Sequence, residues 1–288
     1  MKLFFYLLML SLFFTFSLCS GPKSHEEDTA ESTEEIRELS PLTLYAFEVG
    51  DILIKDISIF NPGVDEGQQA QFTNSAYLIK HDKGTLIWDT GLPDALADTP
   101  EGNDAPGFLM KMPKRLSDQL AEINVDPQTI DYLAVSHEHG DHIGNMGMFT
   151  TATILLQEEE YISLFENEER PASALDSLKG NAYVKLKDDH DVFGDGSVMI
   201  IRAPGHTAGH QVLYVNLPET GPVVLSGDLY HFSKNRELKG VPSFNSDKEQ
   251  TLASMEMVEK FLVDNNATLW IQHEMQHEGV KWSPEFYR

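Results

Sequence analysis

The chain has 288 residues, 41% of them hydrophobic, and its 46 acidic and 21 basic side chains give a formal net charge of -25. This length suits one large domain or two small ones, with apolar residues enough for a sizeable core. Such an acidic balance argues against nucleic acid or an anionic membrane as a partner.

Residues 1–20 are predicted to be a secretory signal peptide. One lysine precedes an almost unbroken apolar run, which is short for a membrane-spanning helix and usual for a signal. Cys19, the only cysteine, closes the run as in a bacterial lipoprotein signal, although Leu18 stands where a small residue is usual. Lipidation at Cys19, simple cleavage near Ser20 and a retained anchor all stay open. We therefore expect an exported protein, periplasmic or secreted, with a lipid anchor through Cys19 as one option.

Residues 21–40 are rich in Ser, Glu and Thr, and are predicted to form a flexible acidic tether. The folded domain is expected over residues 41–288.

The first part of this domain shows strand patterns. Alternating apolar residues over 44–57 predict an edge hairpin with its turn at Gly50-Asp51. The runs 76–80 and 85–89 predict two strands joined by a turn at 81–84. Asp89 ends the second strand, either as a cap of the turn or as a group that orients a metal ligand. Residues 92–113 lack periodicity, so their apolar side chains either wall a pocket or pack against the domain.

Further along, strands and helices alternate. Residues 113–123 are predicted to be helical, an acidic helix is expected from Glu158, and an amphipathic helix over 247–262. Strands are predicted at 131–135, 153–156, 197–203, 212–215, 223–226 and 268–272.

Metal-capable side chains gather at the ends of these strands. The segment 136–145, which follows the strand 131–135, carries four of them within six positions, and single ones follow three later strands. Imidazole and carboxylate together suit zinc, and also iron or manganese. The candidate ligands are His137, His139, Asp141, His142, His206, Asp228 and His273.

Five histidines and two aspartates are too many for one tetrahedral zinc, and they fit two ions that share a site. Asp228 is the natural bridge, because a carboxylate has two oxygens. A water held between two cations would ionise near neutral pH and act as a nucleophile. His277 is an alternative to His273, and His210 and His231 are expected to be either neighbours of the ligands or exposed.

The motifs H-E-H-G-D-H, P-G-H-T-A-G-H, S-G-D and W-D-T-G, with a lone histidine after a strand, resemble the metallo-β-lactamase superfamily. The resemblance covers nearly all of the chain from about Leu42. It implies an α/β fold, a four-layer αβ/βα sandwich with the metal ions at one edge of two packed sheets. Residues 41–288 would then be a hydrolase domain.

Within the superfamily the chain is most similar to N-acyl homoserine lactonases. This implies two Zn²⁺ per chain and opening of the lactone ring by a metal-bridging hydroxide. By the resemblance, one zinc is held by His137, His139 and His206, and the other by Asp141, His142 and His273, with Asp228 as the bridge.

Two catalytic side chains also follow from the resemblance. Asp141 would pass a proton to the leaving alkoxide. Family members carry a tyrosine soon after the bridging aspartate that contacts the substrate carbonyl. Here Tyr230 follows Asp228 by two positions rather than three, where His231 sits. We favour Tyr230 for this role over His231.

Other activities stay open at this point. A β-lactamase or a thioesterase of the same superfamily is the nearest alternative, and a non-catalytic metal binder is a more distant one. The expected partner is a small lactone, and the expected assembly is a monomer or a homodimer.

Overall fold

The computed structural model describes residues 42–167, 175–275 and 279–288, which belong to a folded unit that spans Leu39–Arg288. The predicted signal peptide and tether, Cys19 and His277 lie outside the described residues. Within the described ranges, no helix has the length and apolar character needed to cross a bilayer.

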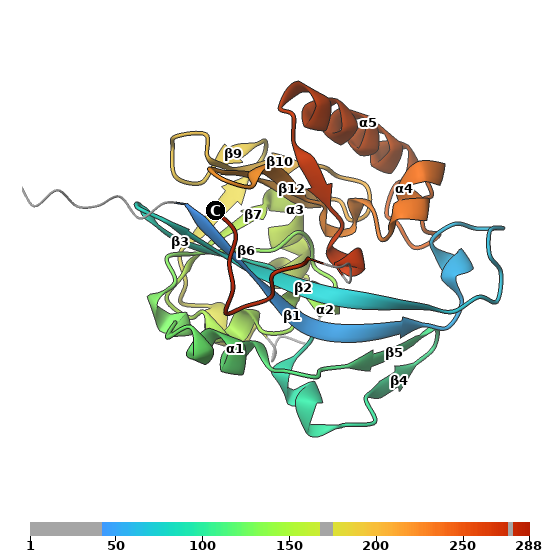
Figure 1. Ribbon diagram of the computed structural model, residues 1–288, viewed down its shortest axis with the longest axis horizontal. Coiled ribbons are helices and arrows are strands. Elements are labelled where there is room, and N and C mark those ends of the chain that lie inside the picture. The colour runs from blue at the N-terminus through green and yellow to red at the C-terminus, as the bar shows by residue number, and fades with distance from the viewer. Residues whose placement is uncertain (1–41, 168–174, 276–278) are drawn as a thin grey trace, which may run out of the picture. The chain divides into compact units, whose positions relative to one another are not determined.

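The described residues form two sheets that pack face to face (Figure 1). The larger has eight strands in the order β4-β5-β1-β2-β3-β6-β7-β8, antiparallel from β4 to β3 and parallel from β3 to β8. Its strands are β1 (Thr43–Ile54), β2 (Ala70–His81), β3 (Gly84–Trp88), β4 (Asn103–Ala105), β5 (Phe108–Lys111), β6 (Tyr132–Ala134), β7 (Thr153–Gln157) and β8 (Tyr183–Leu186).

The smaller sheet has five strands in the order β13-β12-β11-β10-β9, antiparallel except for the parallel pair β12 and β13. Its strands are β9 (His190–Asp191), β10 (Val198–Arg202), β11 (Gln211–Leu217), β12 (Gly221–Leu225) and β13 (Thr268–Trp270). The helices are α1 (Leu116–Glu122), α2 (Gly140–Ile143), α3 (Glu158–Tyr161), α4 (Ser233–Leu238) and α5 (Lys248–Asp264).

Apolar residues on both faces of each central strand explain the layered arrangement. In β2, Tyr77 and Ile79 face the smaller sheet, whereas Ala76 and Leu78 face the core under α1. Successive side chains of a strand point to opposite faces, so such a run must be covered on both sides. Each fully buried large apolar side chain contributes about 1.5–3 kcal/mol. The predicted four-layer αβ/βα sandwich is confirmed.

The helix α5 covers the outer face of the smaller sheet (Figure 1). Met255, Val258 and Leu262 recur at helical spacing and pack on that sheet. The carboxylate of Asp247 accepts a hydrogen bond from the backbone N–H of Gln250, which fixes the start of the helix. The amphipathic helix predicted over 247–262 is confirmed.

The hairpin predicted between residues 76 and 89 is also confirmed, since His81 pairs with Gly84 where β2 meets β3. The hairpin predicted at Gly50-Asp51 is wrong, because β1 runs through this point as one strand. Pairing shifts there from Glu48 with Ser75 to Asp51 with Thr73, which is a β-bulge. Gly50, with φ +153°, occupies the bulge.

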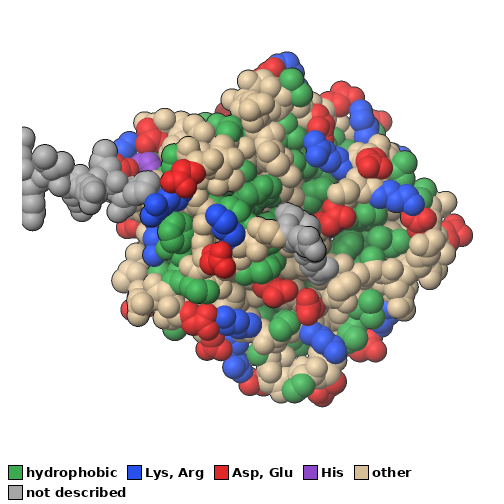
Figure 2. Space-filling view, viewed as in Figure 1, with side chains coloured by type: hydrophobic (Ala, Val, Ile, Leu, Met, Phe, Trp, Pro, Cys, Tyr) green, Lys and Arg blue, Asp and Glu red, His purple; other side chains and the backbone are tan. Residues whose placement is uncertain are grey.

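Nor does β1 lie at an edge. Residues 92–113, predicted without strands, contain β4 and β5, and β5 pairs with β1. The strands β8 and β9 and the helix α4 were likewise not predicted. On the face shown in Figure 2, acidic and basic side chains are interspersed, so this face carries no continuous acidic surface.

Candidate metal centre

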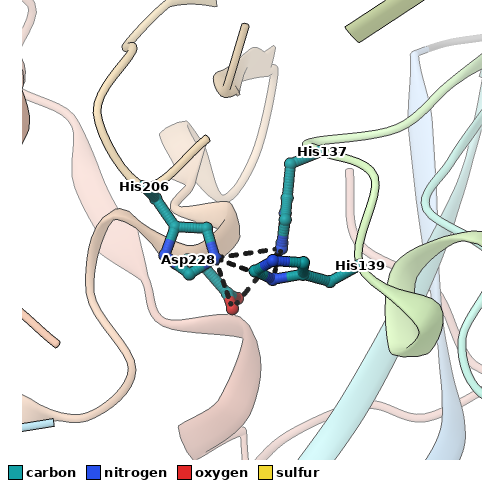
Figure 3. A group of neighbouring side chains, drawn as sticks. All are labelled: His137, His139, His206 and Asp228. Atoms are coloured by element: carbon teal, nitrogen blue, oxygen red, sulfur yellow. Dashed lines mark hydrogen bonds and ion pairs between the residues drawn. The ribbon is translucent and has the colours of Figure 1, made fainter. Parts of the chain in front are cut away.

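The seven predicted ligands meet at one edge of the two sheets, where four strands end. The segment after β6 carries His137, His139 and the short helix α2, and residues that follow β10, β12 and β13 supply the others. Figure 3 shows His137 and His139 on one side of the centre and His206 and Asp228 on the other. Loops at strand ends can aim several side chains at one point, which explains the clustering of residues so distant in sequence.

Three imidazoles form the first group. His137 Nε2 lies 2.9 Å from His139 Nδ1, and His206 Nε2 lies 3.1 Å and 3.0 Å from these two atoms (Figure 3). Nitrogens bound to one tetrahedral zinc are about 3.3 Å apart, given zinc–nitrogen bonds of about 2.0 Å. The first group is therefore close to the size of a zinc site.

Asp141, His142 and His273 form the second group, and Asp228 lies between the groups. Asp228 Oδ1 is 3.2 Å from His142 Nε2 and 3.0 Å from His273 Nε2. Its other oxygen, Oδ2, is 3.4 Å from His206 Nε2 and 3.6 Å from His137 Nε2. Each oxygen of this carboxylate thus faces one group, which is the arrangement a bridging ligand requires.

Hydrogen bonds at the far side of the rings fix their orientation. The Ser136 hydroxyl donates to Asp89, so it accepts from the ring N–H of His137. His142 Nδ1 lies 2.9 Å from Asp89 Oδ2, and His273 Nδ1 donates to the carbonyl oxygen of Thr73 at 3.0 Å. Asp89, whose role the sequence left open, therefore orients a candidate ligand.

The same bonds test whether a cation fits. His206 Nδ1 donates to Asn245 Oδ1, whose amide NH₂ is turned to Thr251. With Nδ1 protonated on both His137 and His206, their Nε2 atoms face each other as lone pairs, which a cation between them would satisfy. In addition, His142 Nε2 and Asp228 Oδ1 are buried 3.2 Å apart, and neither makes a hydrogen bond of good geometry. The donor set fits metal ions in both groups.

Burial and the neighbouring charges together determine the protonation of the candidate ligands. Burial holds the pKa values of His137 and His206 well below the usual range, so both are neutral, as metal binding requires. Burial alone would raise the pKa of Asp228, but the histidines around it hold that pKa well below its usual value. Burial opposes protonation of His142, yet Asp228, Asp141 and Asp89 raise its pKa well above its usual value. The carboxylates of Asp228, Asp141 and Asp89 around His142 thus favour the binding of a cation.

His210 supports the centre without facing it. Burial lowers its pKa to about 4, so the ring is neutral. Its Nδ1 donates to the carbonyl oxygen of Ala203 at 2.9 Å, and its Nε2 accepts from the backbone N–H of Asp228 at 3.0 Å. This ring thus fixes the backbone of Asp228.

The structure does not bring Tyr230 to the centre. Its hydroxyl donates to Glu259 at 2.9 Å, and its ring is buried beside α5. The backbone at Tyr230 is extended, with φ -137° and ψ 135°, so its side chain and the next point to opposite sides. His231 is therefore the side chain that faces the centre, with Nε2 3.2 Å from Asp228 Oδ2. The predicted contact of Tyr230 with substrate does not fit this placement.

A cavity of about 170 Å³ lies beside the two groups. Asp141, Asp228, His139, His231 and His273 form its polar end, and the apolar lining includes Phe108 and Met110. Phe108 and Met110 thus wall a pocket, whereas Leu92 and Met112 of the same segment pack in the core, so each of the two predicted alternatives holds for part of the segment 92–113. The remaining walls are Ile52, Ile54, Phe60, Phe72 and Phe244, which the sequence analysis did not single out.

This fold and this centre identify the class of protein. The chain belongs to the metallo-β-lactamase superfamily, whose family model matches residues 71–265.

Two similar curated proteins carry the name N-acyl homoserine lactonase. AttM of Rhizobium radiobacter is 27% identical over 269 residues, which cover 86% of this chain and 100% of AttM. A lactonase of a Bacillus species is 28% identical over 250 residues, 84% of this chain and 98% of that protein.

Solved structures agree with these similarities. A quorum-quenching N-acyl homoserine lactone hydrolase superposes with a TM-score of 0.73 at 25% identity, covering 86% of this chain and 99% of that one. A second such hydrolase, with the product N-hexanoyl-L-homoserine bound at its catalytic metal centre, gives 0.73 at 26% identity, over 85% and 98% of the two chains.

Proposed function

We propose that this protein is a dinuclear zinc hydrolase that opens the lactone ring of N-acyl homoserine lactones. The observation that carries the proposal is the placement of Asp228, with one oxygen toward each ligand group, at the polar end of an apolar cavity. The similarity to N-acyl homoserine lactonases over most of the chain supports the substrate class.

The donor set supports two zinc ions. His137, His139 and His206 would hold one and Asp141, His142 and His273 the other, with Asp228 shared. When bound, such ions lower the pKa of water and polarise a carbonyl group. Three or four protein ligands for each ion leave room for a small molecule, as catalytic sites require.

Two side chains of the protein take part in the proposed reaction, one by binding the substrate and one by transferring a proton. His231 is buried and lines the cavity, with its Nε2 3.2 Å from Asp228 Oδ2. We assign the hydrogen bond to the lactone carbonyl oxygen to the ring N–H of His231 at this polar end of the cavity. Asp141 also lines the cavity, and Asn74 lies 3.4 Å from its Oδ2. Water adds its oxygen to the carbonyl carbon as the bond from that carbon to the ring oxygen breaks, and we assign Asp141 the transfer of a proton from this water to the ring oxygen.

The cavity walls indicate which group the substrate carries besides the lactone ring. Phe60, Phe72, Phe108, Met110 and Phe244 form an apolar lining next to the polar end. Such a lining suits an acyl chain.

An activity panel on zinc-loaded protein tests this proposal. We expect hydrolysis of N-acyl homoserine lactones, little hydrolysis of β-lactams or thioesters, and loss of activity in Asp228→Ala. Intact lactones after incubation with protein that carries two zinc ions would refute the lactonase. Faster turnover of a β-lactam or a thioester would point to one of the alternative activities instead.

We also propose that the protein is exported, as its first 20 residues indicate. Mass spectrometry of the mature protein from a bacterial host would show an N-terminus near Cys19 or Ser20, with a lipid on Cys19 if the anchor is made. A mature chain that still begins at Met1 in the cytoplasm would contradict export.

A further inference from the structure

Glu160 is a carboxylate buried inside the domain, and the proposed reaction does not use it. It lies in α3, which continues into a π-helical turn at Ile162–Glu166, and it is 1% exposed. A buried carboxylate is costly unless a partner compensates it, so its partners indicate what it does.

The groups around the Glu160 carboxylate belong to the two loops that carry the first ligand group. Glu160 Oε1 accepts hydrogen bonds from the hydroxyl of Thr207 and, at 3.0 Å, from the backbone N–H of Gly209. Thr207 follows His206 directly. The other oxygen, Oε2, is buried without a hydrogen-bond partner among the described residues, and the nearby backbone N–H of Glu138 lowers the pKa of the carboxylate. Glu138 stands between His137 and His139 in the chain.

The packing around Glu160 is tight on the side of the His206 loop. A Cβ atom added to Gly209 would lie 2.8 Å from Glu160 Cγ and 2.8 Å from its backbone nitrogen. The same helical segment also holds the other loop, because the Ser163 hydroxyl donates to the Glu138 carboxylate. One short segment thus contacts both loops.

We propose that Glu160 is a positioning residue of the metal centre: its carboxylate holds the loop of His206 on the helical segment whose Ser163 holds the loop of His137 and His139, and this sets the spacing of the three imidazoles. Glu160 makes its hydrogen bonds to Thr207 and Gly209 rather than to the three ligands, so the effect passes through these two residues on one side and through Ser163 and Glu138 on the other. The inference rests on the metal centre proposed above, but not on the identity of the substrate.

Zinc affinity, measured by competition with a chelator, tests this role separately from catalysis. Glu160→Gln keeps a carbonyl oxygen to accept the bonds of Thr207 and Gly209, so its affinity should stay within about threefold of the wild type. Glu160→Leu keeps the bulk and loses the acceptor, and one of the two ions should bind at least about tenfold more weakly. Glu158→Gln, a half-exposed carboxylate paired with Lys187, is the matched control and should change nothing.

Three results separate the outcomes. Unchanged affinity for both ions in a folded Glu160→Leu, with only a lower melting temperature, would show that Glu160 is a packing residue and overturn the inference. If that variant does not fold, Thr207→Val takes its place, with weaker binding of one ion expected and unchanged binding again contradicting the role. A wild type that binds no zinc would refute the proposed metal centre itself.

Discussion

Replacing Glu160 with glutamine should change how folding stability depends on pH in the metal-free protein. Burial, with a smaller effect of the nearby Glu138 carboxylate, raises the pKa of Glu160 from 4.5 to about 7. The folded state therefore holds the proton more tightly than the unfolded chain. The stability that this proton gives is complete below pH 4.5 and is lost as the pH rises through 7.

The size of the effect follows from the same two pKa values. Each unit of pKa difference is worth about 1.36 kcal/mol, so ionised Glu160 costs the folded state about 3 kcal/mol above pH 7. Glutamine cannot ionise. Any fixed cost of its amide is the same at both pH values and cancels when they are compared.

Urea unfolding of wild type and Glu160→Gln in the presence of a chelator measures the difference. Relative to wild type, the variant should gain about 2–3 kcal/mol more stability at pH 8.5 than at pH 5. Glu158→Gln should show no such gain. A difference between wild type and Glu160→Gln that is the same at both pH values would refute a raised pKa at Glu160.

Other predictions concern the centre and its support. Tyr230→Phe should keep kcat/KM for the lactone within about threefold, whereas His231→Phe should lower it by about 100-fold with both ions still bound; equal losses would contradict the assignment. Asp89→Asn should weaken zinc binding by about 10–100-fold in chelator competition, because it weakens the hydrogen bond that orients the ring of His142. Retained zinc affinity would exclude Asp89 as the residue that orients this ligand. Gly91→Ala should lower the free energy of unfolding by at least about 2 kcal/mol in urea. The reason is that Gly91 has φ +69° and that the new Cβ would lie 2.3 Å from Val49 Cγ2. An unchanged unfolding midpoint would show that the loop adapts.

Much of the fold was accessible from sequence because local patterns carry it. The hairpin of β2 and β3 has a turn signal between two apolar runs, and α5 has a helical apolar repeat with Asp247 as its cap. The candidate ligands were accessible because each is a metal-capable side chain placed at a predicted strand end. Strand ends meet at a sheet edge, so their proximity followed from the fold.

What the sequence did not reveal depends on contacts between distant residues. Gly50 was read as a turn, yet the pairing of β1 with β2 continues past it. The resemblance to a family that carries a tyrosine here favours Tyr230 over His231, but one position in an extended segment turns a side chain to the other side. Glu160 has no motif at all, and its role emerges only from bonds to Thr207 and Gly209.

Anomalous scattering at the zinc edge from crystals of the zinc-loaded protein tests the central claim most directly. We expect two zinc ions, one on each side of Asp228: the first between His137, His139 and His206, and the second beside Asp141, His142 and His273. A single ion that does not touch Asp228, or no ion at this edge of the sheets, would contradict it.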